Sequence, residues 1–201
     1  MNTDLHKQIK VKINKKLIAA LIAISLNMAY AKSKPEITSD RMEMRRSENI
    51  VIFTGNVKGY ITTKDKEIIR FVADKAVFDE KDDITVLSGS TQPYVIYEST
   101  AVSLTRIFAD KIHINNSTDK IDFESNVRVI QKNQVNNNDN IITGQYGTYD
   151  NLVKTIEMNN GNVIYYSDEY STEFSANLII MYLNEQRLVL EQKVHGYLSK
   201  L

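Results

Sequence analysis

The chain has no cysteine and no tryptophan, and only 2 prolines, 7 glycines and 3 histidines among its 201 residues. The absence of cysteine excludes disulfides, thiolate metal sites and cysteine nucleophiles. The low content of proline and glycine excludes the collagen-like and proline-rich classes. Apolar residues make up 42% of the chain, which is enough to build a core and argues against wholesale disorder.

The formal net charge is zero, but the charges are unevenly distributed along the chain. Residues 1–31 contain five lysines and one acidic residue. Removing them from the 25 basic and 25 acidic residues leaves 20 basic and 24 acidic ones, a net charge of −4. Binding to nucleic acid requires clustered Lys and Arg that neutralise phosphates, so we expect no nucleic-acid partner.

Residues 1–31 have the three parts of a secretory signal peptide. A lysine-rich run precedes the apolar segment Leu17–Leu26, and Ala29-Tyr30-Ala31 supplies the small residues of a signal-peptidase site. Leu17–Ala31 spans only 15 residues, whereas a membrane-spanning helix needs about 20. We therefore expect cleavage after Ala31 and export of residues 32–201 as one domain. The alternative is that the segment is retained as a membrane anchor.

The rest of the chain consists of five copies of one unit, each with two landmarks. The first landmark, a small residue followed by a polar one, recurs at spacings of 34, 36, 35 and 32 residues. The second landmark follows the first by 16, 16, 16, 17 and 16 residues. The single offset of 17 predicts a bulge near Asn159-Asn160. The first landmarks are Ser39-Asp40, Ala73-Asp74, Ala109-Asp110, Gly144-Gln145 and Ala176-Asn177, and the second are Gly55-Asn56-Val57, Gly89-Ser90-Thr91, Ser125-Asn126-Val127, Gly161-Asn162-Val163 and Gln192-Lys193-Val194.

Each unit is predicted to form two strands around a polar turn, because apolar and polar residues alternate with a period of two. In the third unit Ile121, Phe123, Val127 and Val129 share one face, opposite Asp122, Glu124, Asn126 and Arg128. In the fifth, Leu188, Leu190 and Val194 lie opposite Glu191, Lys193 and His195. About ten strands joined by short turns favour an all-β barrel, sandwich or jelly roll.

No motif of an enzyme or a metal site is present. The sequence contains no G-x-S-x-G, H-E-x-x-H, Walker or Rossmann pattern, and neither His113 nor His195 has a second ligand at metal-binding spacing. We therefore expect no enzymatic activity, no cofactor and no metal. Asp40, Asp74 and Asp110 recur at one position of the unit, and we favour a strand-end or bulge hydrogen bond to the backbone over contact with a ligand.

The landmarks resemble those of the LptA/OstA family of periplasmic lipopolysaccharide-transport proteins. The similarity rests on Ile37-Thr38-Ser39-Asp40, Phe53-Thr54-Gly55-Asn56-Val57, Phe71-Val72-Ala73-Asp74 and Ile107-Phe108-Ala109-Asp110, and it extends over about residues 36 to 198. It implies an open-ended, slightly twisted β-jellyroll built from about five two-stranded repeats. It also implies that lipid A acyl chains lie between the sheets and that copies or partners dock end to end to bridge the two membranes.

The resemblance implies a set of partners and a location. The cargo would be lipopolysaccharide or lipooligosaccharide, and the protein would lie in the periplasm. An LptC-like inner-membrane subunit would dock at the N-terminal edge, Glu36 to Met44, and an LptD-like outer-membrane protein at the C-terminal edge, Arg187 to Leu198. Two alternatives remain: a membrane-anchored LptC-like subunit of the same system, and a purely structural, self-assembling β protein.

The candidate binding residues are chosen by their face of the strand and their position in the unit. The arginines of the first unit are candidates for contact with phosphate groups, since Arg matches phosphate geometry, or they are charges that protect an edge strand. The tyrosines of the middle units either line a cavity or pack within the sheet. The predicted lipid-facing residues are Phe53, Val57, Phe71, Phe123, Val127, Val129, Leu188 and Leu190, the arginines are Arg41, Arg45 and Arg46, and the tyrosines are Tyr94, Tyr97, Tyr146, Tyr149, Tyr165, Tyr166 and Tyr170.

Overall fold

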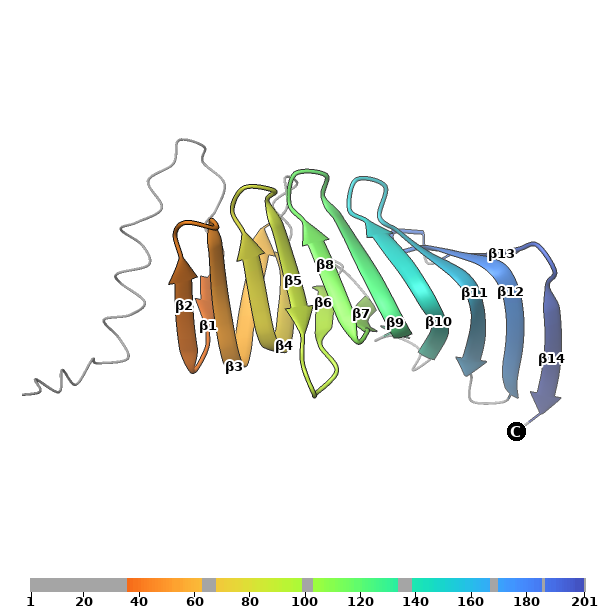
Figure 1. The fold of residues 1–201 in the computed structure, drawn as a ribbon. Helices are drawn as coiled ribbons and strands as arrows, with labels where there is room; N and C mark the ends of the chain where they lie inside the picture. Colours follow the sequence, from red (N-terminus) through yellow and green to blue (C-terminus); the bar gives the residue numbers. More distant parts are fainter. Residues whose placement is uncertain are drawn as a thin grey trace, which may run out of the picture. The chain divides into compact units, whose positions relative to one another are not determined.

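A computed structural model describes residues 36–62, 68–98, 103–133, 139–166, 170–185 and 187–200, and all of its regular elements are β-strands (Figure 1). The expected signal segment, residues 1–31, lies outside the described residues, so its cleavage remains a prediction. The strands are β1 (Glu36–Thr38), β2 (Arg41–Arg45), β3 (Ile50–Thr62), β4 (Ile68–Asp79), β5 (Ile84–Ser88), β6 (Tyr94–Glu98), β7 (Ser103–Phe108), β8 (Lys111–Asn115), β9 (Lys120–Asn133), β10 (Asp139–Asp150), β11 (Thr155–Tyr166), β12 (Tyr170–Tyr182), β13 (Arg187–Glu191) and β14 (His195–Lys200).

The six long strands β3, β4, β9, β10, β11 and β12 each run through two half-sheets. β4, for example, pairs with β5 through Lys75–Asp79 and with β6 through Ile69–Val72. We call the part of the sheet that contains β2, β5, β8 and β13 the first half-sheet, and the part that contains β1, β6, β7 and β14 the second. All pairings are antiparallel, as expected for units made of hairpins.

The landmarks of the sequence mark the corner where the chain passes from one half-sheet to the other. The backbone there is left-handed, with φ between 48° and 78°, at Gly55-Asn56, Ser125-Asn126 and Gln192-Lys193. The corner also explains why fourteen strands are present and not about ten. Four of the ten predicted strands are interrupted at it, giving the pairs β1/β2, β5/β6, β7/β8 and β13/β14. The prediction of five repeats, each with two strands around a turn, is confirmed.

The predicted position of a bulge is wrong. The register shifts between Thr54 and Val57 in the pairing of β3 with β4, and at Gly144/Tyr146 in the pairing of β10 with β9. Across Asn160 the register of β11 with both neighbours is continuous. The corner of β11 is at Asn160, the one residue there with a left-handed backbone (φ of 50°). The Gly161-Asn162-Val163 motif begins one residue after this corner, and this displacement accounts for the offset of 17.

Hairpin turns line the edge of the first half-sheet that lies opposite the corner (Figure 1). Each of four turns ends in a left-handed residue with φ between 54° and 56°. Main-chain hydrogen bonds link successive turns into a ladder, which satisfies backbone groups that a row of separate turns would leave to water. The bonds run from the N–H groups of Glu80, Asn116, Asn151 and Leu183 to the carbonyl groups of Asn49, Asp83, Asp119 and Lys154 at 2.9, 3.1, 3.0 and 2.9 Å.

The core lies between the two half-sheets, where the inner faces of all five units meet. The alternation predicted for the third unit is confirmed: Ile121, Phe123, Val127 and Val129 are buried, while Asp122 and Arg128 are exposed. The prediction for Val194 is wrong, because its side chain is 46% exposed. Val194 lies between β13 and β14, which pair only with β12 among the described strands, so no neighbour covers it.

Candidate functional site

The residues predicted to face a lipid come together in one apolar cluster. Phe53, Val57, Phe71, Phe123, Val127 and Val129 are all buried between the half-sheets. Strand alternation places them there, because every second residue of β3, β4 and β9 points inward. Leu188 and Leu190 on β13 are partly buried and pack against the same cluster. The eight predicted positions therefore share one face, and their contact with lipid stays a prediction.

This interior is filled by the protein's own side chains. The rings of Tyr97 on β6 and Tyr149 on β10 lie 5.6 Å apart and join the two half-sheets. We call the edge opposite the corner, where the hairpin turns lie, the open edge. A cavity of about 20 Å³ lies there between Ile61 and Ile69 of one half-sheet and Ile114 and Ile121 of the other. Such a volume holds about one water molecule and no hydrocarbon chain. An apolar ligand can enter between the half-sheets only if they separate.

The apolar face continues onto the terminal strands at both ends. On β2, Met42 and Met44 are paired with Phe53 and Val51 of the core, and their side chains are 37% and 43% exposed. At the other end, Leu188 is paired with Met181 on β12. Because cross-strand partners share a face, the inner apolar surface is exposed at the first strand of the first half-sheet and only partly buried at the last.

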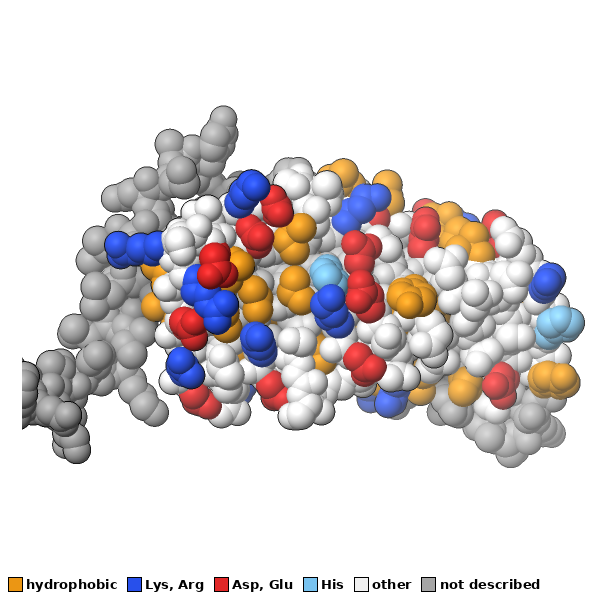
Figure 2. All heavy atoms as spheres, viewed as in Figure 1, with side chains coloured by type: hydrophobic (Ala, Val, Ile, Leu, Met, Phe, Trp, Pro, Cys, Tyr) orange, Lys and Arg blue, Asp and Glu red, His pale blue; other side chains and the backbone are white. Residues whose placement is uncertain are grey.

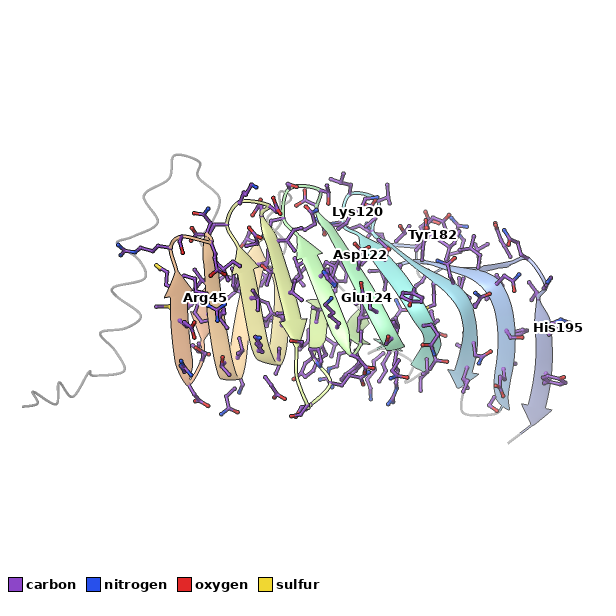
Figure 3. The ribbon with its side chains drawn as sticks, viewed as in Figure 1. Arg45, Lys120, Asp122, Glu124, Tyr182 and His195 are labelled. Atoms are coloured by element: carbon purple, nitrogen blue, oxygen red, sulfur yellow. The ribbon has the colours of Figure 1, made fainter. Side chains whose placement is uncertain are left out.

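The predicted phosphate-binding arginines lie on the outer face or in a turn. Arg45 Nε donates to Glu43 Oε1 at 2.8 Å, and Arg41 Nη2 lies 3.3 Å from Glu43 Oε2 (Figure 3 labels Arg45 on β2). The hydrogen bond and charge of Arg45 lower the pKa of Glu43. Arg46 is exposed in the turn after β2. Arg41 and Arg45 thus already have carboxylate partners, as charges on an edge strand do, and they point away from the apolar interior.

The recurring aspartates form structural hydrogen bonds across the corner, but the predicted bond to the backbone is present only at Asp74, because the carboxylates of Asp40 and Asp110 accept from side-chain amides. Asp40 Oδ2 accepts from Asn56 Nδ2 at 2.8 Å, and Asp110 Oδ2 accepts from Asn126 Nδ2 at 2.6 Å. Asp74 Oδ2 accepts from the Thr91 N–H at 2.8 Å and from the Ser90 hydroxyl at 2.9 Å. These two donors, the Thr91 N–H first, lower the pKa of Asp74.

His113 and His195 lie apart on the outer surface. His113 Nε2 is 3.3 Å from Glu124 Oε1, and His195 begins β14 at the far end of the sheet (Figure 3). In the part of the chain that the structure describes, no three His, Cys, Asp or Glu side chains are grouped to hold a metal ion. Acidic and basic side chains are interspersed on the face shown in Figure 2, with no large area of one sign. Over the same residues, no helix is long and apolar enough to cross a membrane.

One polar group inside the open edge was not anticipated from the sequence. Asn151 Oδ1 accepts from the Tyr149 hydroxyl at 2.8 Å and from Lys154 Nζ at 2.9 Å, and all three side chains are buried. The sequence places Asn151 in a turn but carries no signal that Lys154 folds back over it. The exposed tip of the same turn, Leu152-Val153, is apolar.

Two antiparallel half-sheets that share long strands and enclose one apolar interior define an all-β jellyroll. Residues 36–187 match the family model described as "LptA/(LptD N-terminal domain) LPS transport protein", which is more than half of the chain. The chain therefore belongs to the LptA/LptD N-terminal (OstA) family of lipopolysaccharide-transport proteins. This is a family of non-enzymatic transport proteins.

The fold is similar to that of a solved structure, LptH, described as the LptA homologous periplasmic component of the conserved lipopolysaccharide transport device from Pseudomonas aeruginosa. The two share 12% sequence identity with a TM-score of 0.52, over 63% of this chain and 82% of that one. At this identity the likeness establishes the jellyroll fold alone. None of the curated proteins compared with the chain matches it.

Proposed function

We propose that this protein is a periplasmic carrier that binds lipopolysaccharide or lipooligosaccharide and holds its acyl chains between the half-sheets. The observation that carries the proposal is the inner apolar face, which runs through all five units, is exposed at one end at Met42/Met44 and is only partly buried at the other end at Leu188/Leu190. A structural, self-assembling protein would use the same ends for assembly, so binding of lipopolysaccharide is what distinguishes a carrier from it. A carrier uses these ends to continue the groove into its neighbours.

The free energy of hydrocarbon burial is sufficient to drive uptake. Each methylene buried contributes about 0.8 kcal/mol, so one acyl chain of ordinary length contributes on the order of 8 kcal/mol. Against this stand contacts between the half-sheets, such as that of Tyr97 with Tyr149. Lipid would replace those contacts with its own chains as the half-sheets separate about the corner. Neither a nucleotide nor a catalytic group is required for such holding.

In this proposal the two ends are docking sites for partners. An LptC-like inner-membrane subunit would pair with the N-terminal edge at β1 and β2. An LptD-like outer-membrane protein, or another copy of the chain, would pair with the C-terminal edge at β13 and β14. Edge strands present unpaired backbone groups that readily accept an added strand.

Photo-crosslinking tests the location of the lipid. Benzoylphenylalanine in place of Phe123, which is 1% exposed on the inner face, should capture lipopolysaccharide on irradiation. The same residue in place of Asp122, one position along β9 and on the outer face, is the matched control and should capture none. Equal capture at both positions, or capture at neither, would count against the groove.

The mature N-terminus distinguishes the carrier from an anchored LptC-like subunit. A protein that begins at Lys32 in the soluble periplasmic fraction supports the carrier. An intact N-terminus in the membrane fraction supports the anchored subunit, and mass spectrometry reads out either result. A protein that binds no lipopolysaccharide in either form would instead be the structural, self-assembling alternative.

A further inference from the structure

The corner of the fourth unit differs from those of the first three. In the first three, the aspartate of one strand is bonded to a polar side chain of the next, as Asp40 is to Asn56 and Asp110 to Asn126. The fourth unit has Gln145 at this position. Its side chain forms no hydrogen bond with any residue in the described ranges, and neither do the side chains of Asn160 and Asn162 across the corner.

A hollow of about 360 Å³ lies at this corner, on the outside of the jellyroll. The hollow is shallow and open to solvent. Five of its lining residues carry side-chain amides, and one carries a guanidinium. The residues that matter here are Gln92, Asn126, Arg128, Gln145, Asn160 and Asn162.

One feature of the backbone leaves this space open. The pairing of β10 with β11 has no bulge, so no residue is inserted to fill the corner from the β11 side. Gly144 lies in the floor of the hollow, but a Cβ atom there would point inward, 2.6 Å from Met158 Cγ and Sδ of the core, so this glycine serves the packing of the interior. Tyr146 follows Gln145 on β10 without lining the hollow, and its side chain is 59% exposed.

We propose that this hollow binds a saccharide. Amide groups both donate and accept hydrogen bonds, which suits the hydroxyl groups of a sugar. The exposed ring of Tyr146 offers an apolar face of the kind that packs against a sugar ring. Arg128 forms no ion pair with the described residues. Asp110 does not line the hollow, but its carboxylate accepts from two of the lining amides, Asn126 Nδ2 at 2.6 Å and Gln92 Nε2 at 3.5 Å, so the amides that remain for a ligand are those of Gln145, Asn160 and Asn162. These features select a saccharide that carries phosphate or carboxylate, since guanidinium binds both.

This site is separate from the acyl-chain groove, because its side chains lie outside the corner while Val127 beneath them is buried. The sugar could belong to the carbohydrate part of a glycolipid or be a free saccharide. Two probes distinguish these sources: the lipid-free oligosaccharide released from lipopolysaccharide by mild acid, and maltotriose, which is neutral. Neither probe has acyl chains, so the result does not depend on whether the interior binds lipid.

Titrations followed by the backbone amide NMR signals test the proposal. We expect saturable shifts at residues 126–128, 143–145 and 160–162, and binding weakened on the order of tenfold by Asn162→Ala or Arg128→Ala. Asn160→Gly should also weaken binding, because it removes the amide while keeping the left-handed backbone. Arg106→Ala, an exposed arginine on β7 of the second half-sheet, is the control and should bind as the wild type does.

The outcomes separate clearly. Binding of the lipopolysaccharide oligosaccharide alone supports a site for the charged sugar of a glycolipid, and equal binding of both probes overturns the selection of a charged saccharide. The proposal is overturned if neither probe shifts these signals at millimolar concentration, or if the shifts lie elsewhere and persist in Asn162→Ala. All substituted side chains are exposed, so thermal unfolding should confirm that each variant folds.

Discussion

The ring of Tyr97 on β6 lies 5.6 Å from the ring of Tyr149 on β10, with the two planes inclined at 50°. Tyr97 belongs to the second half-sheet and Tyr149 to the first half-sheet, so this pair joins the two layers across the interior. Both side chains are buried. The same interior that is proposed to hold acyl chains is therefore closed by contacts between layers, and separation of the layers becomes a step that can be tested.

A crosslink between the half-sheets should prevent uptake of lipid. The chain contains no cysteine, so Ile61→Cys combined with Ile121→Cys places two unique thiols on opposite half-sheets, beside the same small cavity. Joining them with a short bis-methanethiosulfonate reagent should abolish binding of lipopolysaccharide, and reduction should restore it. Fluorescence of a labelled lipopolysaccharide measures both.

The matched control for that experiment keeps the same reagent within one half-sheet. Ile61 and Ile69 are cross-strand partners on β3 and β4. A crosslink between cysteines at these two positions leaves the half-sheets free to separate, so binding should be unchanged. If the crosslink between half-sheets binds lipid as well as this control does, then acyl chains do not enter between the layers.

A charge on the inner face should destabilise the fold. Phe123 is 1% exposed, and Phe123→Asp places a carboxylate among apolar side chains without a partner. We expect the free energy of unfolding to fall by about 4 kcal/mol, since an unpaired buried charge is among the costliest changes. Urea titration measures the loss. Asp122→Asn, on the outer face, keeps an acceptor for the Thr148 hydroxyl and should change stability by only about 0.5 kcal/mol.

The period-two pattern predicted the inner face of the third unit well because one face of its strands is buried and the other is exposed to solvent. The inward orientation of Phe123 and Val129 is predicted by this alternation alone. The pattern predicted Val194 wrongly because burial there depends on a neighbouring strand, and among the described strands β13 and β14 have a partner on one side only. Whether a residue lies at an end of the sheet is a property of topology, which local alternation does not encode.

The bulge was misplaced for a different reason. The motif Gly161-Asn162-Val163 matches Gly55-Asn56-Val57 in letters, but the register places the corner of β11 at Asn160. Spacing between similar residues cannot distinguish an inserted residue from a motif that has moved along the strand. The fold of Lys154 over Asn151 also lay beyond the sequence, because it depends on contacts made only after the layers close.

The corner should be sensitive to the conformation of Gly55. Its φ is 78°, and a Cβ atom there would lie 2.5 Å from Asp40 Oδ2. Gly55→Ala should therefore lower the free energy of unfolding by about 1–3 kcal/mol, through backbone strain and displacement of the carboxylate. Asn56→Gly, next along the chain, keeps the left-handed backbone and loses only the bond to Asp40, so it should be milder. Comparable urea midpoints for the two variants would show that strain at Gly55 is unimportant.

The hydrogen bonds to Asp74 should make the free energy of unfolding depend on pH. Its ordinary pKa of 3.8 is lowered in the folded protein by the Thr91 N–H and the Ser90 hydroxyl. A lowered folded-state pKa gives stability that is present above about pH 4 and is lost as the pH falls toward the folded pKa. Between about pH 4 and pH 2 the wild type should thus lose stability more steeply than Asp74→Asn. Ser90→Ala, which keeps the Thr91 donor, should lie between them, and parallel melting curves for all three would refute this linkage.

The last prediction concerns association through the ends of the sheet. Nine successive antiparallel pairings separate β2 from β13, so these two strands run in opposite directions. A second copy in the same orientation would therefore present its β2 to β13 of the first as an antiparallel partner. Met42 and Met44 would then meet Leu188 and Leu190, and the apolar interior would continue from copy to copy. Contacts of this head-to-tail kind do not close, so they give filaments or mixed complexes and not a symmetric dimer.

Met44→Lys should weaken this association without weakening the fold, because the Met44 side chain is 43% exposed in the single chain but would be covered between two. The matched control is Thr54→Lys, which adds the same charge near the same end of the sheet but on the exposed outer face of β3. Light scattering over a range of concentrations should show a growing mean mass for the wild type and for Thr54→Lys, and a constant mass for Met44→Lys. A wild type that remains monomeric throughout, and that crosslinks to no partner at either edge, would contradict the bridge, because an acyl chain could then leave the groove only into water.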